Sequence, residues 1–319
     1  MFKAPVVSIL VISYNTCEMT LACLRSVVAQ TQVPYELIVV DNASSDGSAA
    51  AIAAEFPNLT LLAETTNHGF AKANNIAARH AKGTYILLLN PDTVVLNGAI
   101  DALVAFAERK PQAQIWGGRT LFGDGRLNAN SGFGQMTLWS VFCTATGLSS
   151  VFKATRLFNP EGYGGWLRDT ERRVDVVSGC FLLLPRNLWE KLGGFDLQFV
   201  MYGEEADLCL RAHKLGADPH ITPQAEIVHY GGASEKIRVD KMVRLLSAKT
   251  LLIRRHFPAS QQGLGLWLYR LWPLTRWWAQ ALMSVFPGQG RRRDAANQWR
   301  AVWARRGEWQ HGYAPLAAQ

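Results

Sequence analysis

Short apolar runs alternate with helix-like stretches along the first hundred residues. Each run is apolar enough to be covered on both faces of a sheet, as the strands of a parallel sheet are. The predicted strands are 6–12, 36–40, 59–63 and 84–89. Helices are predicted between them, and alanine-rich stretches place two of these at 48–56 and 70–81. Repeated strand-helix-strand units predict an α/β fold with a mainly parallel sheet flanked by helices.

The first predicted helix carries Leu21, Leu24 and Val28 at helical spacing. Asn15 or Thr16 is suited to cap its start. The middle of the chain, 118–172, is rich in Gly, Asn and Ser without a clean period, which predicts a long loop region of the kind that is functional or mobile.

Regular structure is expected to resume with an apolar run at 174–185. A helix follows in which Leu208, Ala212 and Leu215 recur at helical spacing, and Gly216 is suited to end it. The pattern divides the chain into a sheet domain over 1–240 and a helical region over 241–319.

Polar side chains follow the end of each predicted strand in the first hundred residues. Ser13, Tyr14 and Asn15 follow the first strand, 41–48 the second, 67–75 the third and 90–92 the fourth. Ligands of parallel sheets bind at the carboxyl ends of the strands, so this clustering predicts a ligand site. Neither a phosphate loop nor a dinucleotide-binding glycine motif is present. The polar groups suit hydroxyls, base edges and a hard divalent cation, and they include Asp41, Asn67, Asn74, Asn90 and Asp92.

Asp92 stands in "LLLNPDTVV", where Pro91 ends the apolar run. It is either part of an Asn-Pro-Asp turn or a metal ligand. His229, in "AEIVHYGGAS", is either a structural histidine or a second ligand. An imidazole together with a carboxylate can hold Mn²⁺ or Mg²⁺ while substrate oxygens fill the remaining positions.

Three acids, Glu204, Glu205 and Asp207, open the helix in "YGEEADLCLRA". Acids in a first turn are favoured by the helix dipole, and Asp207 is placed to pair with Arg211. Glu205 points away from the side that carries the other two acids. One carboxylate of the three can therefore face a cleft as a general base while the others brace the turn.

Charge is distributed unevenly along the 319 residues. The chain has a net charge of +8, but 241–319 holds 13 Lys or Arg against 2 Asp or Glu, so this region alone carries +11. Seven of the eleven tryptophans also lie there. The five scattered cysteines indicate neither a zinc site nor a disulfide framework and favour a reducing cytoplasm. The first apolar run is too short for a signal or membrane-spanning segment.

A stripe of apolar residues marks one face of a helix predicted within 264–293. It is followed by Arg291–Arg293, and Pro273 is expected to start or kink the helix. The stripe consists of Trp267, Leu271, Leu274, Trp278, Ala281 and Val285. Such a helix favours an anionic membrane surface. A packing or homodimer interface is the second interpretation, and nucleic-acid binding is disfavoured because the aromatic residues form an apolar stripe.

With these segments in order, the chain resembles the family 2 glycosyltransferases of the GT-A fold, in particular their rhamnosyltransferase-like branch. The resemblance covers residues 5–235. It rests on "VSILVISYN", "ELIVVDNASSDGS", "NHGFAKANN", "LLLNPDTVV", "VSGCFLLLPRNLWEKLGGFD", "FVMYGEEADLCLRAHKLG" and "IVHYGG", which follow the order of the family.

The resemblance implies a role for each matching residue. Asp41, with the turn Ser13–Asn15, would hold the base or ribose of a nucleotide. Asp92 would coordinate the Mg²⁺ or Mn²⁺ that bridges the diphosphate, and His229 would add a metal or diphosphate contact. Asn90 stands where the family has the first Asp of its metal motif. Glu205 stands where the family has a catalytic Asp, with Glu204 or Asp207 as the alternative base.

The implied activity is inverting transfer of a sugar, with dTDP-rhamnose as the leading nucleotide-sugar donor and a lipid-linked glycan as acceptor. A UDP-hexose donor is the alternative within the same chemistry. A non-catalytic glycan-binding or scaffold subunit is the alternative from another class. The expected location is the cytoplasm, peripherally associated with the inner face of the membrane.

Overall fold

The computed structural model describes residues 4–231, 238–286, 288 and 290–314. Within the segments "IVHYGG" and 264–293, Gly232, Pro287 and Gln289 lie outside the described residues. The chain forms two compact units. The first, here called the sheet unit, comprises Met1–Phe133, Leu167–Leu197 and Glu204–Ser234. The second, the helical unit, comprises Gly134–Trp166, Gln198–Gly203 and Glu235–Gln319.

A single large sheet organises the sheet unit. Its main strands are β1 (Val7–Ser13), β2 (Tyr35–Asn42), β3 (Thr60–Glu64), β4 (Tyr85–Leu89), β5 (Thr93–Val95), β6 (Trp116–Leu121), β11 (Phe181–Pro185) and β12 (His220–His229). They lie in the order β3-β2-β1-β4-β11-β6-β12-β5. The first four are parallel, β11 is antiparallel to both of its neighbours, β6 and β12 are parallel to each other, and β5 is antiparallel to β12. The predicted α/β fold with a helix-flanked sheet is confirmed, but the sheet is mixed: β3-β2-β1-β4 form the parallel part, and antiparallel pairs join β11 and β5 to their neighbours.

Short strands complete the sheet unit. They are β7 (Leu127–Asn128), which pairs with β6, β9 (Arg172–Arg173), which pairs with β12, and the separate pair β8 (Gly132–Phe133) and β10 (Val176–Val177). Two 3₁₀ turns, Pro111–Ala113 and Ala129–Ser131, lie in the connections on either side of β6 and β7.

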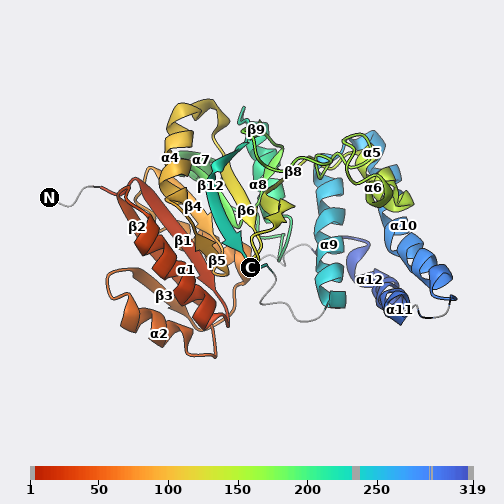
Figure 1. Cartoon of the computed structure of the whole chain (residues 1–319), viewed down its shortest axis with the longest axis horizontal. Coiled ribbons are helices and arrows are strands. Elements are labelled where there is room, and N and C mark those ends of the chain that lie inside the picture. The colour runs from red at the N-terminus through yellow and green to blue at the C-terminus, as the bar shows by residue number, and fades with distance from the viewer. Residues whose placement is uncertain (1–3, 232–237, 287, 289, 315–319) are drawn as a thin grey trace. The chain divides into compact units, whose positions relative to one another are not determined.

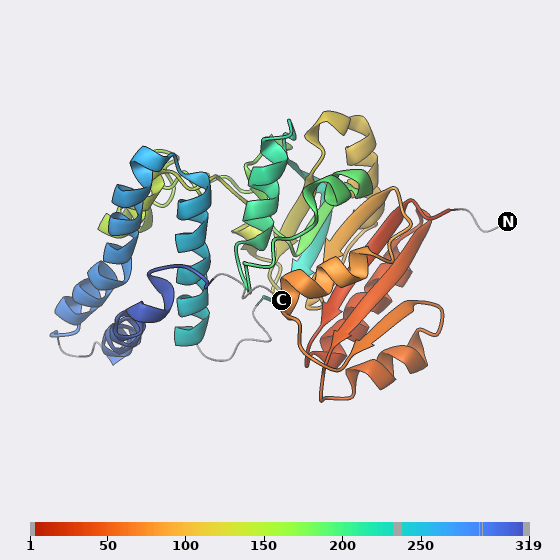
Figure 2. The ribbon, with the colours of Figure 1, turned by 180° about the vertical axis from the view of Figure 1, so that it is seen from behind.

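Helices cover both faces of the sheet. On one face lie α1 (Cys17–Gln30), α2 (Ser48–Glu55) and α4 (Ala99–Arg109), as Figure 1 shows. On the other face lie α3 (Gly69–Ala78), α7 (Arg186–Leu192) and α8 (Glu204–His213), which are seen in Figure 2. This double covering explains why every residue of β1 is buried.

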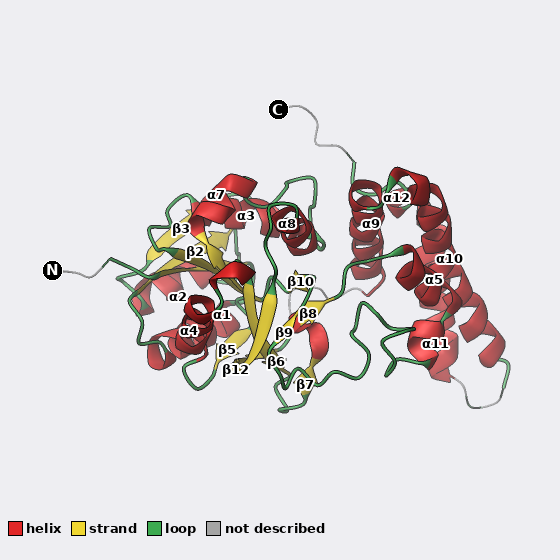
Figure 3. Ribbon diagram, turned by 90° about the horizontal axis from the view of Figure 1, so that it is seen from above, coloured by secondary structure: helices red, strands yellow, loops and turns green. Residues whose placement is uncertain are grey.

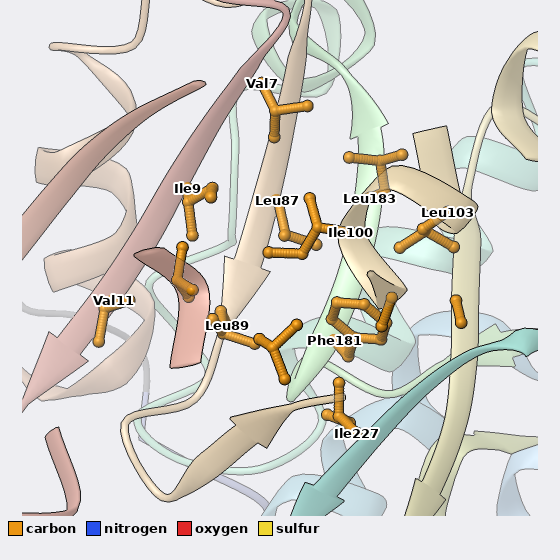
Figure 4. Packing of buried hydrophobic residues seen from close by; sticks show 14 of the residues in the cluster. Val7, Ile9, Val11, Leu87, Leu89, Ile100, Leu103, Phe181, Leu183 and Ile227 are labelled. Atoms are coloured by element: carbon orange, nitrogen blue, oxygen red, sulfur yellow. The ribbon is translucent and has the colours of Figure 1, made fainter. Parts of the chain in front are cut away.

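The core between the sheet and α4 is built from alternate strand residues. Figure 4 shows Leu87 and Leu89 of β4 and Leu183 of β11 close to Ile100 and Leu103 of α4. Successive residues of a strand point to opposite faces of the sheet. The strand residues that alternate with these therefore pack against the helices on the other face. Full burial of each such side chain contributes about 1.5–3 kcal/mol.

Two local expectations differ from the structure. Strand β3 is the edge of the sheet, and Thr60 and Ala63 are exposed, so it is not covered on both faces as predicted. Helix α1 is rotated so that Val27 is buried and Val28 is half exposed. The difference arises because a periodic pattern locates a helix more securely than it locates the edge of the buried face.

The helical unit has its own core. Its helices are α5 (Leu138–Thr146), α6 (Leu148–Val151), α9 (Arg238–His256), α10 (Ala259–Met283), α11 (Gly290–Ala304) and α12 (Arg306–Trp309), and Figure 3 shows them gathered together. Buried members of its core are Val141, Leu246, Ile253, Tyr269 and Trp309.

The predicted loop region 118–172 contains helices that its composition did not reveal. Helix α5 begins with a capping box in which Thr137 and Ser140 each accept a hydrogen bond from the other's backbone N–H. Its residues Val141 and Ala145 pack in the core of the helical unit. The helical unit therefore takes up 134–166 as well as the C-terminal region, whereas the predicted boundary lay at residue 240.

Helix α10 corrects one further expectation. It begins at Ala259 and runs through Pro273, which therefore does not start it. No helix in the described part of the chain combines the length and the apolar character that crossing a membrane requires.

Candidate functional site

The carboxyl ends of β1, β2 and β4 meet at one edge of the sheet. In the register of these strands, Ser13 lies opposite Asp41, and Val11 lies opposite Leu89, the residue before Asn90. Residues distant in the sequence therefore form a continuous polar edge beside the central strands. This is the place predicted for a ligand.

Asp41 has an oxygen without a protein partner. Its side chain is buried, and Oδ2 accepts a hydrogen bond of 3.2 Å from the backbone N–H of Ser44. Oδ1 is buried and accepts no hydrogen bond from the residues that the structure describes. A buried carboxylate oxygen without a donor is costly, so a donor from a bound ligand would stabilise it.

In the turn after β1, Ser13 and Asn15 form hydrogen bonds within the protein, and Tyr14 is exposed. The Ser13 hydroxyl lies 2.9 Å from that of Thr20. Asn15 adopts φ 51°, and its Oδ1 accepts a hydrogen bond of 2.8 Å from the backbone N–H of Ser45. The Tyr14 side chain between them remains 40% exposed and available to a ligand.

The two predicted binding residues near α3 make hydrogen bonds within the protein, Asn67 from an exposed position and Asn74 from a buried one. Asn67 Oδ1 accepts hydrogen bonds from the Asn42 side chain at 2.9 Å and from the Gly69 N–H at 2.8 Å. Asn74 is buried and donates to the carbonyl of Phe70 at 2.9 Å within its own helix. These contacts hold the loop and the helix in place.

Asn90, Asp92 and His229 come together at the neighbouring part of the edge. The last residue of β12 is His229, which pairs with Thr93 of β5. Its Nε2 lies 3.4 Å from Asp92 Oδ1 and 3.4 Å from Asn90 Nδ2. Asn90 Oδ1 is buried and has no hydrogen-bond partner among the described residues.

The surroundings of His229 favour its protonated form. Burial disfavours the charged form, but the side chains of Cys180 and Asp92 outweigh burial and raise the pKa of His229 to about 10. A histidine binds a metal through its neutral imidazole, so metal binding at His229 would compete with protonation.

Cys180 is a member of the site that the sequence pattern missed. Its carbonyl accepts a hydrogen bond of 3.1 Å from the Asn90 N–H, and its thiol contacts His229. It precedes β11, which runs antiparallel to β4, so only the strand pairing brings it here. No spacing along the sequence could have indicated this position.

The donor set fits a hard divalent cation. Asp92 offers carboxylate oxygen, Asn90 offers the buried amide oxygen without a partner, and His229 offers an imidazole nitrogen. No group of three or more His, Cys, Asp or Glu side chains in the described residues is arranged to enclose a metal. The protein therefore offers an open site, in which ligand oxygens would complete the coordination of Mg²⁺ or Mn²⁺.

The three acids of α8 differ in environment. Burial, and then the charge of Glu205, raise the pKa of Glu204 well above its usual value, and Glu204 Oε2 has no hydrogen-bond partner in the described part of the chain. Asp207 is buried and bonds to Arg211 at 2.7 Å, which confirms the predicted pair. Both acids are buried, and Asp207 is held in a salt bridge, so an acceptor hydroxyl reaches neither as readily as it would a half-buried acid.

Glu205 is the half-buried acid of this turn. A Cβ atom built on Gly179 would lie 3.6 Å from the Cβ of Glu205 and 3.7 Å from the ring of Phe70. Since Gly179 precedes Cys180, whose carbonyl binds Asn90, Glu205 is close to the same edge of the sheet. The site thus combines an acidic group at the start of α8 with the cluster at the end of β4.

Comparison with known proteins identifies relatives of the sequence. Residues 8–158 match the family described as Glycosyl transferase family 2. The O-antigen biosynthesis protein RfbC of Myxococcus xanthus is 28% identical over 73% of this chain, which spans only 18% of the length of RfbC. EpsE, a candidate glycosyltransferase of Bacillus subtilis, is 30% identical, with 65% of this chain and 75% of EpsE covered. The N-acetylglucosaminyl-diphospho-decaprenol L-rhamnosyltransferase of Mycobacterium tuberculosis is 28% identical, with 65% and 70% covered.

A solved structure shares the fold. The mannosyltransferase PcManGT from Pyrobaculum calidifontis, determined in complex with GDP-Man and Mn²⁺, aligns with a TM-score of 0.59. The alignment covers 96% of this chain and 88% of that enzyme at 17% sequence identity. The likeness confirms the predicted GT-A fold.

Proposed function

Because the chain belongs to glycosyl transferase family 2, and is rhamnosyltransferase-like in sequence, we propose that it transfers L-rhamnose from dTDP-rhamnose to a hydroxyl of a lipid-linked or cell-surface glycan. The observation that carries the proposal is the pair of buried oxygens without partners, Asp41 Oδ1 and Asn90 Oδ1, at one edge of the sheet. Both are acceptors that a bound nucleotide sugar and its cation would satisfy.

Asp41 binds the nucleoside in this proposal. Its Oδ1 accepts a hydrogen bond from the base or ribose, and the exposed Tyr14, which follows the Ser13 that lies opposite Asp41 in the sheet, contacts the same group. Asp92, His229 and the amide oxygen of Asn90 would hold Mg²⁺ or Mn²⁺. When bound, this cation neutralises charge on the departing diphosphate.

Glu205 acts as the general base. It accepts the proton of the acceptor hydroxyl while that oxygen forms a bond to the anomeric carbon of the sugar. The bond between this carbon and the diphosphate oxygen breaks, and the diphosphate leaves with the electron pair. A single displacement inverts the configuration and needs only one base, which suits a turn whose other two acids are buried.

The relatives support this choice of acceptor and donor. The Mycobacterium tuberculosis relative is named as a rhamnosyltransferase that acts on a decaprenol-linked sugar, and RfbC is named for O-antigen biosynthesis. A lipid-linked acceptor would place the enzyme at the cytoplasmic face of the membrane. A UDP-hexose donor is the alternative, and an inactive glycan-binding or scaffold subunit is the alternative from another class.

The proposal is tested by donor hydrolysis and thermal shift with purified full-length protein. With Mn²⁺ or Mg²⁺ present, dTDP-rhamnose should raise the melting temperature more than UDP-glucose or GDP-mannose, because a bound ligand stabilises the native state. Asp92→Ala and Glu205→Gln should both abolish turnover, but only Asp92→Ala should remove the metal-dependent part of the shift. A protein that releases no nucleoside diphosphate from any donor would be a scaffold.

A further inference from the structure

Helix α10 has one face buried in the helical unit. Leu268 and Tyr269 pack in its core, and a Cβ atom on the buried Gly265 would lie 3.1 Å from the ring of Phe257. The Thr275 hydroxyl donates to the carbonyl of Ala145 at 2.7 Å. These contacts account for one side of the helix, which runs along the helical unit in Figure 1.

The other face of α10 exposes large apolar side chains. Leu264 is 51% exposed, Trp267 55%, Trp278 66% and Leu282 73%. Leu274, which is half-buried, lies between them at helical spacing. Leu271 has the same spacing and is half-buried, but it also packs against the core of the helical unit. From Leu264 to Leu282 the stripe is about 27 Å long at 1.5 Å per residue. The chain directly after α10 adds Val285 and Phe286, which are 78% and 66% exposed. Contiguous apolar surface of this kind is uncommon on water-exposed faces and marks a binding surface.

Positive charge is concentrated at the end of the stripe that leads into α11. The segment 259–286 has no acidic residue, and its only charged residues are Arg270 and Arg276. Arg276 is held to the side by a hydrogen bond of 2.8 Å to Ser150. The next helix, α11, then begins with Arg291–Arg293. Cations at the start of a helix are unfavourable for its dipole, so their presence there is not explained by helix stability.

We propose that the exposed face of α10, with Val285, Phe286 and the start of α11, docks on an anionic lipid bilayer. The apolar stripe inserts at the depth of the headgroups with α10 parallel to the membrane plane, and the arginines bind phosphate groups. A second copy of the chain is a poorer partner for this face, because docking would bring two regions of net charge +11 together. This inference is independent of the proposed reaction, since it concerns no residue of the candidate site.

Vesicle co-sedimentation of the full-length protein tests the proposal. The wild-type protein should bind vesicles of phosphatidylcholine with a third of phosphatidylglycerol at least tenfold more tightly than vesicles of phosphatidylcholine alone. The double variant Trp278→Glu/Leu282→Glu should lose at least tenfold in binding to the anionic vesicles. Arg291→Glu/Arg293→Glu should lose the preference for anionic lipid and its salt dependence.

Two controls make the outcome decisive. Val28→Glu replaces an apolar side chain that is 50% exposed on α1 of the sheet unit, and it should bind vesicles as the wild type does. Glu205→Gln should also bind normally, even though turnover is lost. The proposal is wrong if the wild-type protein does not bind anionic vesicles or if the α10 variant binds undiminished. It is also wrong if that variant instead converts a dimer to a monomer in sedimentation velocity with vesicle binding unchanged.

Discussion

Removal of Arg211 should destabilise the sheet unit strongly, because this side chain compensates a buried charge. Its guanidinium bonds to Asp207 at 2.7 Å and to the carbonyls of Leu192 and Gly194 at 2.7 and 2.9 Å. The Asp207 side chain is 1% exposed and that of Arg211 is 24% exposed. Arg211→Met removes this ion pair from the buried carboxylate of Asp207 and this donor from two carbonyls.

The burial of this ion pair determines how much unfolding free energy the substitution should remove. Breaking a buried ion pair by removing one partner costs about 3–5 kcal/mol. A quarter of the Arg211 side chain is exposed, so water can replace part of its contacts, and we expect a loss near the lower end, about 3 kcal/mol. A domain of this size loses about 2–4 °C of Tm per kcal/mol, which predicts a Tm about 6–12 °C lower.

Circular dichroism melting of wild type, Arg211→Met, Asp207→Asn and the double variant measures both the loss and the coupling. The double variant should be more stable than the sum of the two single losses predicts, because it leaves no buried charge unpaired. Asp207→Asn should keep donor turnover once folded, in contrast to Glu205→Gln. A Tm of Arg211→Met within about 2 °C of wild type would refute the assignment of Asp207 as a brace, as would loss of turnover in folded Asp207→Asn.

Three further changes have defined outcomes. The pKa of Glu204 is raised in the folded protein, so its stability contribution is complete below the unfolded pKa of about 4.3 and is lost as pH rises towards the folded value. Glu204→Gln should therefore gain in Tm relative to wild type between about pH 5 and pH 8, and a constant difference would contradict this. Gly118→Ala should lower the free energy of unfolding, measured in urea, by about 3 kcal/mol or more, because the new Cβ would lie 2.1 Å from the carbonyl oxygen of Ala225. A decrease of less than about 1 kcal/mol would show that the backbone shifts to relieve this contact. Asn90→Asp adds a carboxylate beside Asp92 and should raise Mn²⁺ affinity about tenfold by calorimetry, whereas unchanged affinity would make Asn90 only a strand cap.

The sequence predicted the edge of the sheet well because strand ends are local features. An apolar run followed by Asn90-Pro91 must end at the proline, whatever the rest of the fold does. The same holds for the polar turn after β1 and for Asp41 at the end of β2. The parallel order of the strands then brought these ends together, as the repeated strand-helix-strand pattern had indicated.

Features that depend on long-range pairing could not be predicted in the same way. Cys180 enters the site only because β11 inserts antiparallel next to β4. Helix α5 lies in a region rich in Gly, Asn and Ser, and it is stabilised by packing in the core of the helical unit, which the sequence does not show. Asn67 and Asn74 are of a residue type that often binds ligands. In the structure their side chains form hydrogen bonds to Asn42, Gly69 and Phe70 of the protein itself.

The acids at the start of α8 show why residue type alone does not define a catalytic group. Glu204, Glu205 and Asp207 lie within four residues, and each could serve as a base by its chemistry. Glu204 is buried, and the guanidinium of Arg211 pairs with the buried Asp207. Glu205 is half-buried and lies beside Gly179, which precedes the residue that binds Asn90. The sequence can therefore propose the group of acids, whereas the burial that favours Glu205 in our proposal depends on the fold.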